Sequence, residues 1–157
     1  MTEKEQKYDE LLKKAAALVA GETDVIANMA NLAALLHSSM GFWWTGFYIV
    51  KQSSDGVRQL VLGPFQGPVA CTRIPFGRGV CGTAWQNGST VIVPDVEQFP
   101  GHIACSSQSR SEIVVPIMAN GEVAAVLDID SQYLNTFDAV DKQYLEQLVE
   151  LVTLSPQ

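Results

Sequence analysis

The chain has few basic residues and no long apolar run. Lysine and arginine together number 10 among 157 residues, against 17 aspartates and glutamates, so the net charge is −7. A nucleic-acid partner is disfavoured, because phosphate binding needs clustered lysine and arginine. No apolar stretch approaches the roughly eighteen residues of a membrane-spanning helix. The sequence therefore argues against both a nucleic-acid-binding and a membrane protein.

Cysteine is also scarce, with only Cys71, Cys81 and Cys105. An odd number of cysteines fits badly with a fully paired framework of structural disulfides. The N-terminal segment mixes acids with bases and lacks the apolar centre of a signal peptide, so we expect the protein in the cytoplasm. Disulfides in that compartment tend to be transient and catalytic. We therefore interpret the three thiols as candidates for chemistry.

The apolar content of 47% predicts a folded chain of about one domain's length. Apolar residues recur at helical spacing in residues 4–20, 25–40 and 138–154, which predicts three helices. A short helix opened by glycine is predicted for residues 79–86. Strand-forming runs cover residues 42–50, 57–62, 90–93, 112–118 and 122–129. The Asn120-Gly121 pair between the last two runs is a strong hairpin signal. This order favours an α+β fold with one antiparallel sheet and helices on a face.

The cysteines differ in their sequence surroundings. Cys105 lies in a long polar loop, residues 94–109, where burial is not the default, and it ranks first as a nucleophile. Cys81 starts a predicted helix whose dipole would lower the thiol pKa, but its small apolar neighbours are equally consistent with burial. Cys71 follows two apolar residues and is equally ambiguous.

Metal binding is the competing use of these thiols. The cysteines are separated by nine and then by twenty-three residues, and no C-x-x-C motif occurs. His102 is the only histidine near a cysteine. His37 ends an apolar helix, where a helix-end or surface role is expected. The spacing therefore disfavours a zinc site.

Two acids and two aromatic residues also allow more than one interpretation. Asp128 and Asp130 point to one side of the last predicted strand, opposite Ile129. They either mark its solvated end, or accept an ammonium group or share a proton with a third acid, which would raise one pKa. Trp44 and Tyr48 share a face of the first strand, as core aromatics or as the wall of a small apolar pocket.

Five short motifs contain most of these residues. They are Gly-Pro-Phe-Gln-Gly-Pro-Val-Ala-Cys at 63–71, Gly-Arg-Gly-Val-Cys-Gly-Thr-Ala-Trp at 77–85, Phe-Pro-Gly-His-Ile-Ala-Cys at 99–105, Ser-Arg-Ser-Glu-Ile-Val-Val-Pro-Ile at 109–117 and Leu-Asp-Ile-Asp-Ser at 127–131. Together they closely resemble the free methionine-(R)-sulfoxide reductases, which are stand-alone GAF domains. Sensory GAF domains share the fold but not three cysteines at these places.

This resemblance implies a single GAF domain over residues 1–157, with an antiparallel sheet of about six strands, N- and C-terminal helices packed on it, and commonly a homodimer. The implied reaction is the thiol-dependent reduction of free L-methionine (R)-sulfoxide to L-methionine. Cys105 matches the attacking cysteine, which becomes a sulfenic acid, and Cys71 the thiol that resolves it as a Cys71–Cys105 disulfide. Cys81 matches an auxiliary thiol. Thioredoxin would reduce the disulfide, and no metal or organic cofactor is needed.

The resemblance also assigns a substrate pocket. The residues that match it are Trp44, Tyr48, Glu112, Asp128 and Asp130. We expect one acid, Glu112 first, to stay protonated because three carboxyls crowd one pocket, and to donate a proton to the leaving oxygen. We expect backbone N–H groups from Ser109 through Arg110 and Ser111 to Glu112 to bind the substrate carboxylate.

Two other functions use similar features. A small-ligand sensor module would normally need an attached output domain, for which 157 residues leave no room, and it has no use for three thiols in loops. A thiol redox sensor would keep the cysteines but would not need an acidic pocket. The residues alone reach a cytosolic thiol-dependent enzyme or sensor, and the resemblance favours the reductase.

Overall fold

Six antiparallel strands form the centre of the computed structural model, which describes residues 1–103, 105 and 107–154. The strands are β1 (Trp44–Gln52), β2 (Arg58–Gln66), β3 (Arg73–Pro75), β4 (Val91–Val93), β5 (Ser111–Ala119) and β6 (Glu122–Ser131). Their order in the sheet is β3-β2-β1-β6-β5-β4, so β1 and β6 are the central strands. The helices are α1 (Glu3–Val19), α2 (Val25–Met40), α3 (Gly79–Asn87), α4 (Ala139–Val149) and the short 3₁₀ helix η1 (Val96–Gln98). This confirms the expected α+β fold.

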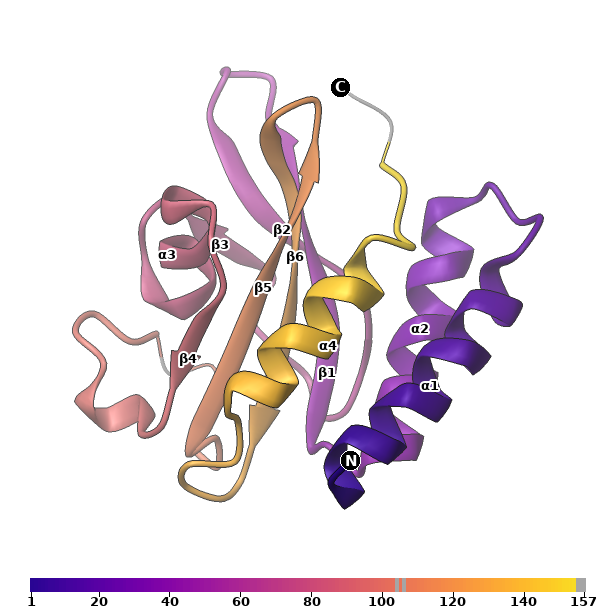
Figure 1. Cartoon of the computed structure of the whole chain (residues 1–157). Helices are drawn as coiled ribbons and strands as arrows, with labels where there is room; N and C mark the ends of the chain where they lie inside the picture. The colour runs from indigo at the N-terminus through magenta and orange to yellow at the C-terminus, as the bar shows by residue number, and fades with distance from the viewer. Residues whose placement is uncertain (104, 106, 155–157) are drawn as a thin grey trace.

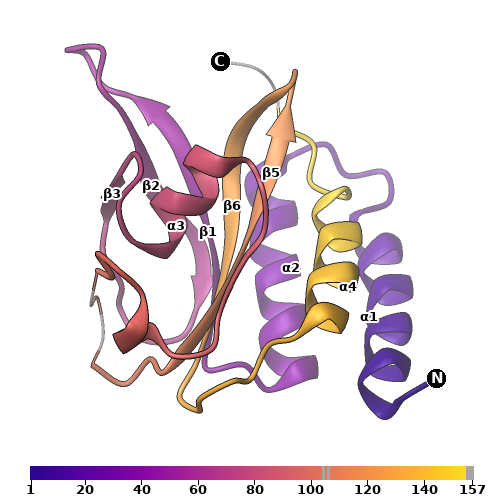
Figure 2. The same cartoon turned by 60° about the vertical axis from the view of Figure 1, so that its left-hand side comes forward.

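Helices lie on both faces of the sheet (Figure 1). α2 and α4 cover one face, and α1 packs on α2 and α4 as an outer layer, as the rotated view shows (Figure 2). α3 lies on the other face, together with the connection from β4 to β5 (Figure 2). None of the helices in the described part of the chain is long and apolar enough to cross a membrane.

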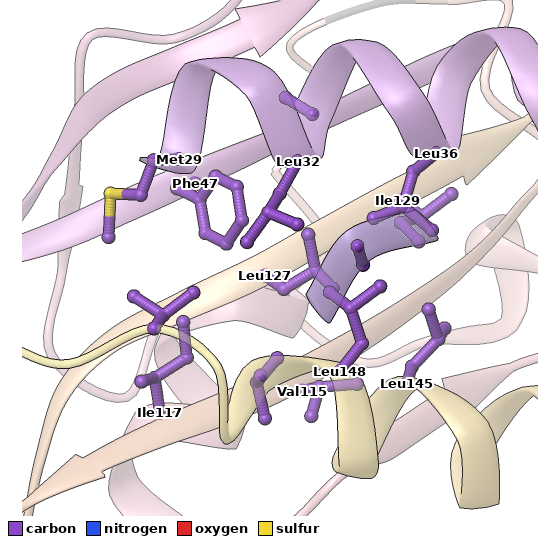
Figure 3. Close-up of a cluster of buried hydrophobic side chains, with 14 of the residues drawn as sticks. Met29, Leu32, Leu36, Phe47, Val115, Ile117, Leu127, Ile129, Leu145 and Leu148 are labelled. Atoms are coloured by element: carbon purple, nitrogen blue, oxygen red, sulfur yellow. The ribbon is translucent and has the colours of Figure 1, made fainter. Parts of the chain in front are cut away.

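The face covered by α2 and α4 carries the main hydrophobic core (Figure 3). Alternate residues of three strands point into it: Phe47, Val115, Ile117, Leu127 and Ile129. The helices contribute the fully buried Leu32, Leu36, Leu145 and Leu148. Burying one such side chain contributes about 1.5–3 kcal/mol. Because strand side chains alternate between faces, the residues between these core positions point to the α3 side.

Side-chain caps explain where the long helices begin. Thr2, Asp24 and Asp138 accept hydrogen bonds from backbone N–H groups in the first turns of α1, α2 and α4. The sequence predicted that the last helix reaches residue 154, but α4 ends at Val149. The backbone continues in tighter turns, in which the N–H of Val152 donates to the carbonyl of Val149. These turns keep Val152 buried in the core.

A buried polar cluster joins α1 to α4. The Tyr8 hydroxyl donates to Asp141 Oδ1 at 2.5 Å, and Lys4 Nζ donates to Asp141 Oδ2 at 2.7 Å. The side chains of Tyr8 and Asp141 are both buried. Removing the hydroxyl would leave the Asp141 carboxylate one donor short inside the protein, where water cannot replace it.

We expect Tyr8→Phe to lower the free energy of unfolding by about 2 kcal/mol, since a hydrogen bond to a charged group contributes about 1.5–3 kcal/mol. Urea unfolding curves measure this change. Tyr144→Phe is the matched control, because its ring stacks on Tyr8 but its hydroxyl is not among the donors to Asp141 in the described residues. An equal loss in both variants would contradict the role of the Asp141 hydrogen bond.

Candidate active site

A cavity lies on the face of the sheet opposite the main core. Its floor comes from β1, β5 and β6, and its walls come from the first turn of α3, residues 68–70 and the loop between η1 and β5. The space in this cavity that the centre of a water molecule can occupy has a volume of about 60 Å³. One water needs roughly 10–15 Å³ on the same measure. The cavity therefore has room for a small organic molecule.

Three carboxylic acids lie side by side on the floor of this cavity. The register of neighbouring strands places Glu112 opposite Asp130, and Gly46 opposite Asp128. Strand alternation turns the three acids toward the cavity and Ile129 toward the core. Glu112 and Asp128 are each only 6% exposed, and Asp130 is half-buried. The interpretation of the two aspartates as a solvated strand end therefore does not hold.

Burial and mutual repulsion raise the pKa values of these acids. Loss of solvation raises the pKa of Glu112 well above its usual range, and the charges of Asp128 and Asp130 raise it further. Burial, followed by the charge of Asp128, has the same effect on the pKa of Asp130. Burial also raises the pKa of Asp128, but its interactions with the Glu112, Cys81 and Asp130 side chains favour its charged form. Asp128 therefore ionises first, and Glu112 keeps its proton to a higher pH.

The three acids differ in their hydrogen-bond partners. Ser109 Oγ donates to Asp130 Oδ1 at 3.0 Å. His102 Nε2 lies 4.0 Å from Glu112 Oε1, and burial lowers the His102 pKa, which favours the neutral ring. Asp128 Oδ1 is buried and accepts no hydrogen bond from the described residues. A buried carboxylate oxygen is costly to leave without a donor, so this atom points to a ligand that supplies one.

Two aromatic residues of β1 form an apolar side of the cavity. The Trp44 and Tyr48 rings stack with centroids 6.1 Å apart. Trp44 Nε1 donates to the Pro68 carbonyl at 2.9 Å, and the Tyr48 hydroxyl donates to the Cys71 carbonyl at 2.8 Å. A Cβ on Gly46 would lie 2.6 Å from the Trp44 ring. Glycine at this position therefore lets the indole lie flat across the strand.

The three cysteines have distinct places around the cavity. A disulfide joins Cys71 and Cys105, whose Cα atoms are 5.4 Å apart although 34 positions separate them in sequence. Cys105 is exposed and lines the cavity. Cys81 is free and buried in the first turn of α3. Burial, and then the charges of Asp128 and Glu112, raise the pKa of the Cys81 thiol, so burial outweighs the helix dipole.

The structure does not bring every predicted site residue to the cavity. Ser111 begins β5 with its side chain on the opposite face, where its hydroxyl donates to a loop carbonyl at 2.6 Å. Arg110 is exposed, and its backbone N–H donates to the Ser131 carbonyl at 2.7 Å. Neither residue lines the cavity, whereas Ser109 and Glu112 do.

Sequence reasoning missed the part of the cavity that the start of α3 provides. Arg78 and Gly79 line it, and Gly79 has a φ of +64°, a conformation that favours glycine. The first helical turn leaves N–H groups without intrahelical partners, and no side chain caps it. Trp43 and His102 also line the cavity. The Gly-Arg-Gly sequence before the helix is the feature of the sequence that could have indicated this part of the cavity.

Known proteins match this chain over nearly its whole length. The GAF domain family matches residues 20–155. GAF domain-containing protein A of Dictyostelium discoideum is 55% identical over 149 residues, which cover 95% of this chain and 92% of that protein. The free methionine-R-sulfoxide reductase of Saccharomyces cerevisiae is 44% identical over 158 residues, covering 97% and 87%. The X-ray structure of free methionine-R-sulfoxide reductase from Neisseria meningitidis in complex with its substrate has a TM-score of 0.92 and 53% identity, and covers 97% of this chain and 89% of that chain.

Proposed function

The chain belongs to the GAF-domain family and, within it, to the free methionine-R-sulfoxide reductases, and we propose that it reduces free L-methionine (R)-sulfoxide to L-methionine. The observation that carries this proposal is the arrangement of Cys105, three acids and two aromatic rings around one cavity. A cavity that only bound a ligand would have no need for a wall cysteine that forms a disulfide. The substrate class fits the cavity, because a free amino acid carries an ammonium that the acids can bind and a carboxylate that the first turn of α3 can bind.

Each part of the cavity can receive one part of this substrate. The ammonium binds at Asp128, whose buried Oδ1 has no donor among the described residues. The carboxylate lies at the first turn of α3 near Gly79, where free N–H groups and the helix dipole favour an anion. The turn before β5 is less suitable, because the Arg110 N–H is already bonded. The S-methyl group packs against Trp44 and Tyr48.

The reaction reduces the sulfoxide and oxidises a cysteine by two electrons. The Cys105 thiolate attacks the sulfoxide sulfur while Glu112 donates a proton to the oxygen. The S–O bond breaks as the oxygen takes a second proton from solvent and leaves as water, and Cys105 is left joined to the methionine sulfur. Water then attacks the Cys105 sulfur and this S–S bond breaks, so methionine is released, a proton passes to solvent, and Cys105 is left as a sulfenic acid. The Cys71 thiolate then attacks the Cys105 sulfur, and water leaves as the disulfide forms. Two electrons thus pass from two thiols to the sulfoxide.

Reduction of the Cys71–Cys105 disulfide completes the cycle. Thioredoxin reduces it by thiol–disulfide exchange, and the exposure of Cys105 gives an external dithiol access. Cys81 is buried and acts only as an auxiliary thiol. We place this activity in the cytoplasm, where thiol reductants are maintained. Residues 1–157 then act as one domain, and we expect two such domains to form a homodimer.

Incubation with dithiothreitol and each epimer of free methionine sulfoxide, followed by amino-acid analysis, tests this function. We expect methionine from the (R) epimer and not from the (S) epimer. Mixtures without the protein control for direct reduction by the thiol. Absence of methionine from both epimers would contradict the proposed reaction, and equal conversion of both would contradict its stereochemistry.

Cys71→Ser should form about one methionine per chain and then fail to recycle with thioredoxin, because the sulfenic acid on Cys105 loses its resolving thiol. Rapid-quench assays with and without thioredoxin measure the burst and the turnover that follows. Peptide mapping of wild-type protein oxidised by substrate should recover the Cys71–Cys105 disulfide. A dominant bridge between Cys81 and Cys105 would instead assign the resolving role to Cys81.

A further inference from the structure

We propose that Cys81, Glu112 and Asp128 form a site for a thiophilic divalent cation such as Zn²⁺, and that the bound ion blocks the substrate cavity. Cation binding stands on the geometry of these residues alone. The blocking effect rests in addition on the proposed function, because the ion would occupy the place of the substrate ammonium. The ion would therefore be an inhibitor and not a cofactor.

The three side chains converge from separate elements. Cys81 comes from α3, Glu112 from β5 and Asp128 from β6, and the sulfur and one oxygen of each carboxylate all lie within 4.8 Å of one another. Zinc bonds measure about 2.3 Å to sulfur and 2.0–2.2 Å to carboxylate oxygen, so small side-chain rotations would bring all three ligands onto one ion. His102 Nε2 lies 4.0 Å from Glu112 Oε1 but outside this group, so solvent would fill the fourth position of a tetrahedral site.

Asp128 independently indicates a positive ligand at this place. Its side chain faces the cavity and is only 6% exposed, and its Oδ1 accepts no hydrogen bond in the described part of the chain. Within residues 1–103, 105 and 107–154, no lysine or arginine forms an ion pair with Glu112, Asp128 or Asp130. A divalent cation would bind the unpartnered oxygen and offset the charge of both carboxylates that hold it.

Cation binding would exchange protons for the ion. A metal ion binds a cysteine as the thiolate and an acid as the carboxylate, so protons on these groups pass to solvent and the affinity should fall as the pH is lowered. The other ionisable groups that line the cavity are Tyr48, Arg78, His102 and Asp130.

The oxidised protein isolates this site for measurement, because the Cys71–Cys105 disulfide leaves Cys81 as the free thiol. We expect titration with Cd²⁺ to produce the ultraviolet absorption of a cadmium–thiolate bond, saturating at about one ion per chain. Zn²⁺ should displace Cd²⁺. Mg²⁺ should not, since it prefers oxygen ligands and retains its waters. Calorimetry in two buffers of different ionisation enthalpy should detect the released protons.

Substitutions assign the ligands. Cys81→Ser should abolish the absorption, and Glu112→Gln and Asp128→Asn should each weaken Cd²⁺ binding by roughly 10- to 100-fold or more. Glu97→Gln, which changes an exposed acid on η1, should leave binding unchanged. Thermal unfolding establishes that each variant is folded. If one carboxylate variant is unfolded, the other provides the test.

Absence of the cadmium–thiolate absorption in the oxidised wild type, or absorption that survives both carboxylate substitutions, would overturn the site. In the reduced protein, Zn²⁺ should inhibit sulfoxide reduction in competition with the substrate, and a chelator should restore it. Cd²⁺ binding without any sulfoxide reduction would support the site and contradict only the proposed function. Sulfoxide reduction without Cd²⁺ binding would contradict only the site.

Discussion

Cys105→Ser should abolish the reduction of free methionine (R)-sulfoxide, with kcat falling by on the order of 1,000-fold or more even in dithiothreitol. The step that breaks the S–O bond loses its nucleophile, because a serine hydroxyl is almost entirely un-ionised near neutral pH. Neither remaining thiol can take its place. Cys81 is buried and its pKa is raised by that burial and by neighbouring carboxylates, and Cys71 does not line the cavity.

Methionine release in a single turnover measures this effect. Cys71→Ser is the matched control, because it also removes the disulfide but keeps the attacking thiol, and it should still release methionine once. Substantial methionine formation by Cys105→Ser would move the nucleophile to Cys71 or Cys81.

Glu112→Gln should lower kcat by roughly 100- to 10,000-fold and change KM much less. Glutamine keeps the size of the side chain but cannot donate a proton to the sulfoxide oxygen. In the wild type, burial and the charges of Asp128 and Asp130 raise the pKa of Glu112, so the protonated acid persists to a higher pH. On the alkaline side of the profile, the wild-type rate should decline as the pH rises through this raised pKa. Glu112→Gln should be slow and should lack this decline.

Rate profiles against pH for the wild type and Glu112→Gln measure both effects. Glu97→Gln, an exposed acid far from any assigned role, controls for the loss of one negative charge. A Glu112→Gln variant with normal kcat and a strongly raised KM would make Glu112 a binding group and remove it from proton transfer.

Local sequence patterns predicted the elements that hold the site. The Asn120-Gly121 turn is present with both residues at positive φ, and it pairs β5 with β6. The turn pairs Ala119 with Glu122, and this register alone would place Glu112 opposite Ile129. A bulge between Ile117 and Met118 shifts the register by one residue and places Glu112 opposite Asp130, which local signals did not predict. The face shared by Trp44 and Tyr48 follows from the same period in β1.

Local sequence patterns could not predict the contacts between separate helices and strands. Whether the helix dipole or burial governs Cys81 depends on which side of α3 packs against the sheet. The predicted strand began at residue 112, but β5 begins at Ser111. The Ser111 hydroxyl therefore lies on the face of β5 that points away from the cavity. Zinc spacing rules count cysteines and histidines along the chain, so they miss a thiol and two carboxylates that three elements bring together.

In the proposed function, the acids of the cavity select the free amino acid. An amide in place of the substrate ammonium would leave a buried carboxylate without its counter-charge, a loss of about 3 kcal/mol or more. That loss corresponds to about 100-fold in kcat/KM. Peptide-bound methionine sulfoxide carries the same amide and should be discriminated to a similar extent.

The direct test is the ratio of kcat/KM for free methionine (R)-sulfoxide to that for its N-acetyl amide, measured with the same protein and reductant. Both compounds present the same sulfoxide to Cys105, so the ratio reports recognition of the charged groups and not the chemistry at sulfur. We expect a preference of about 100-fold or more for the free amino acid. Equal values for the two compounds would contradict the account.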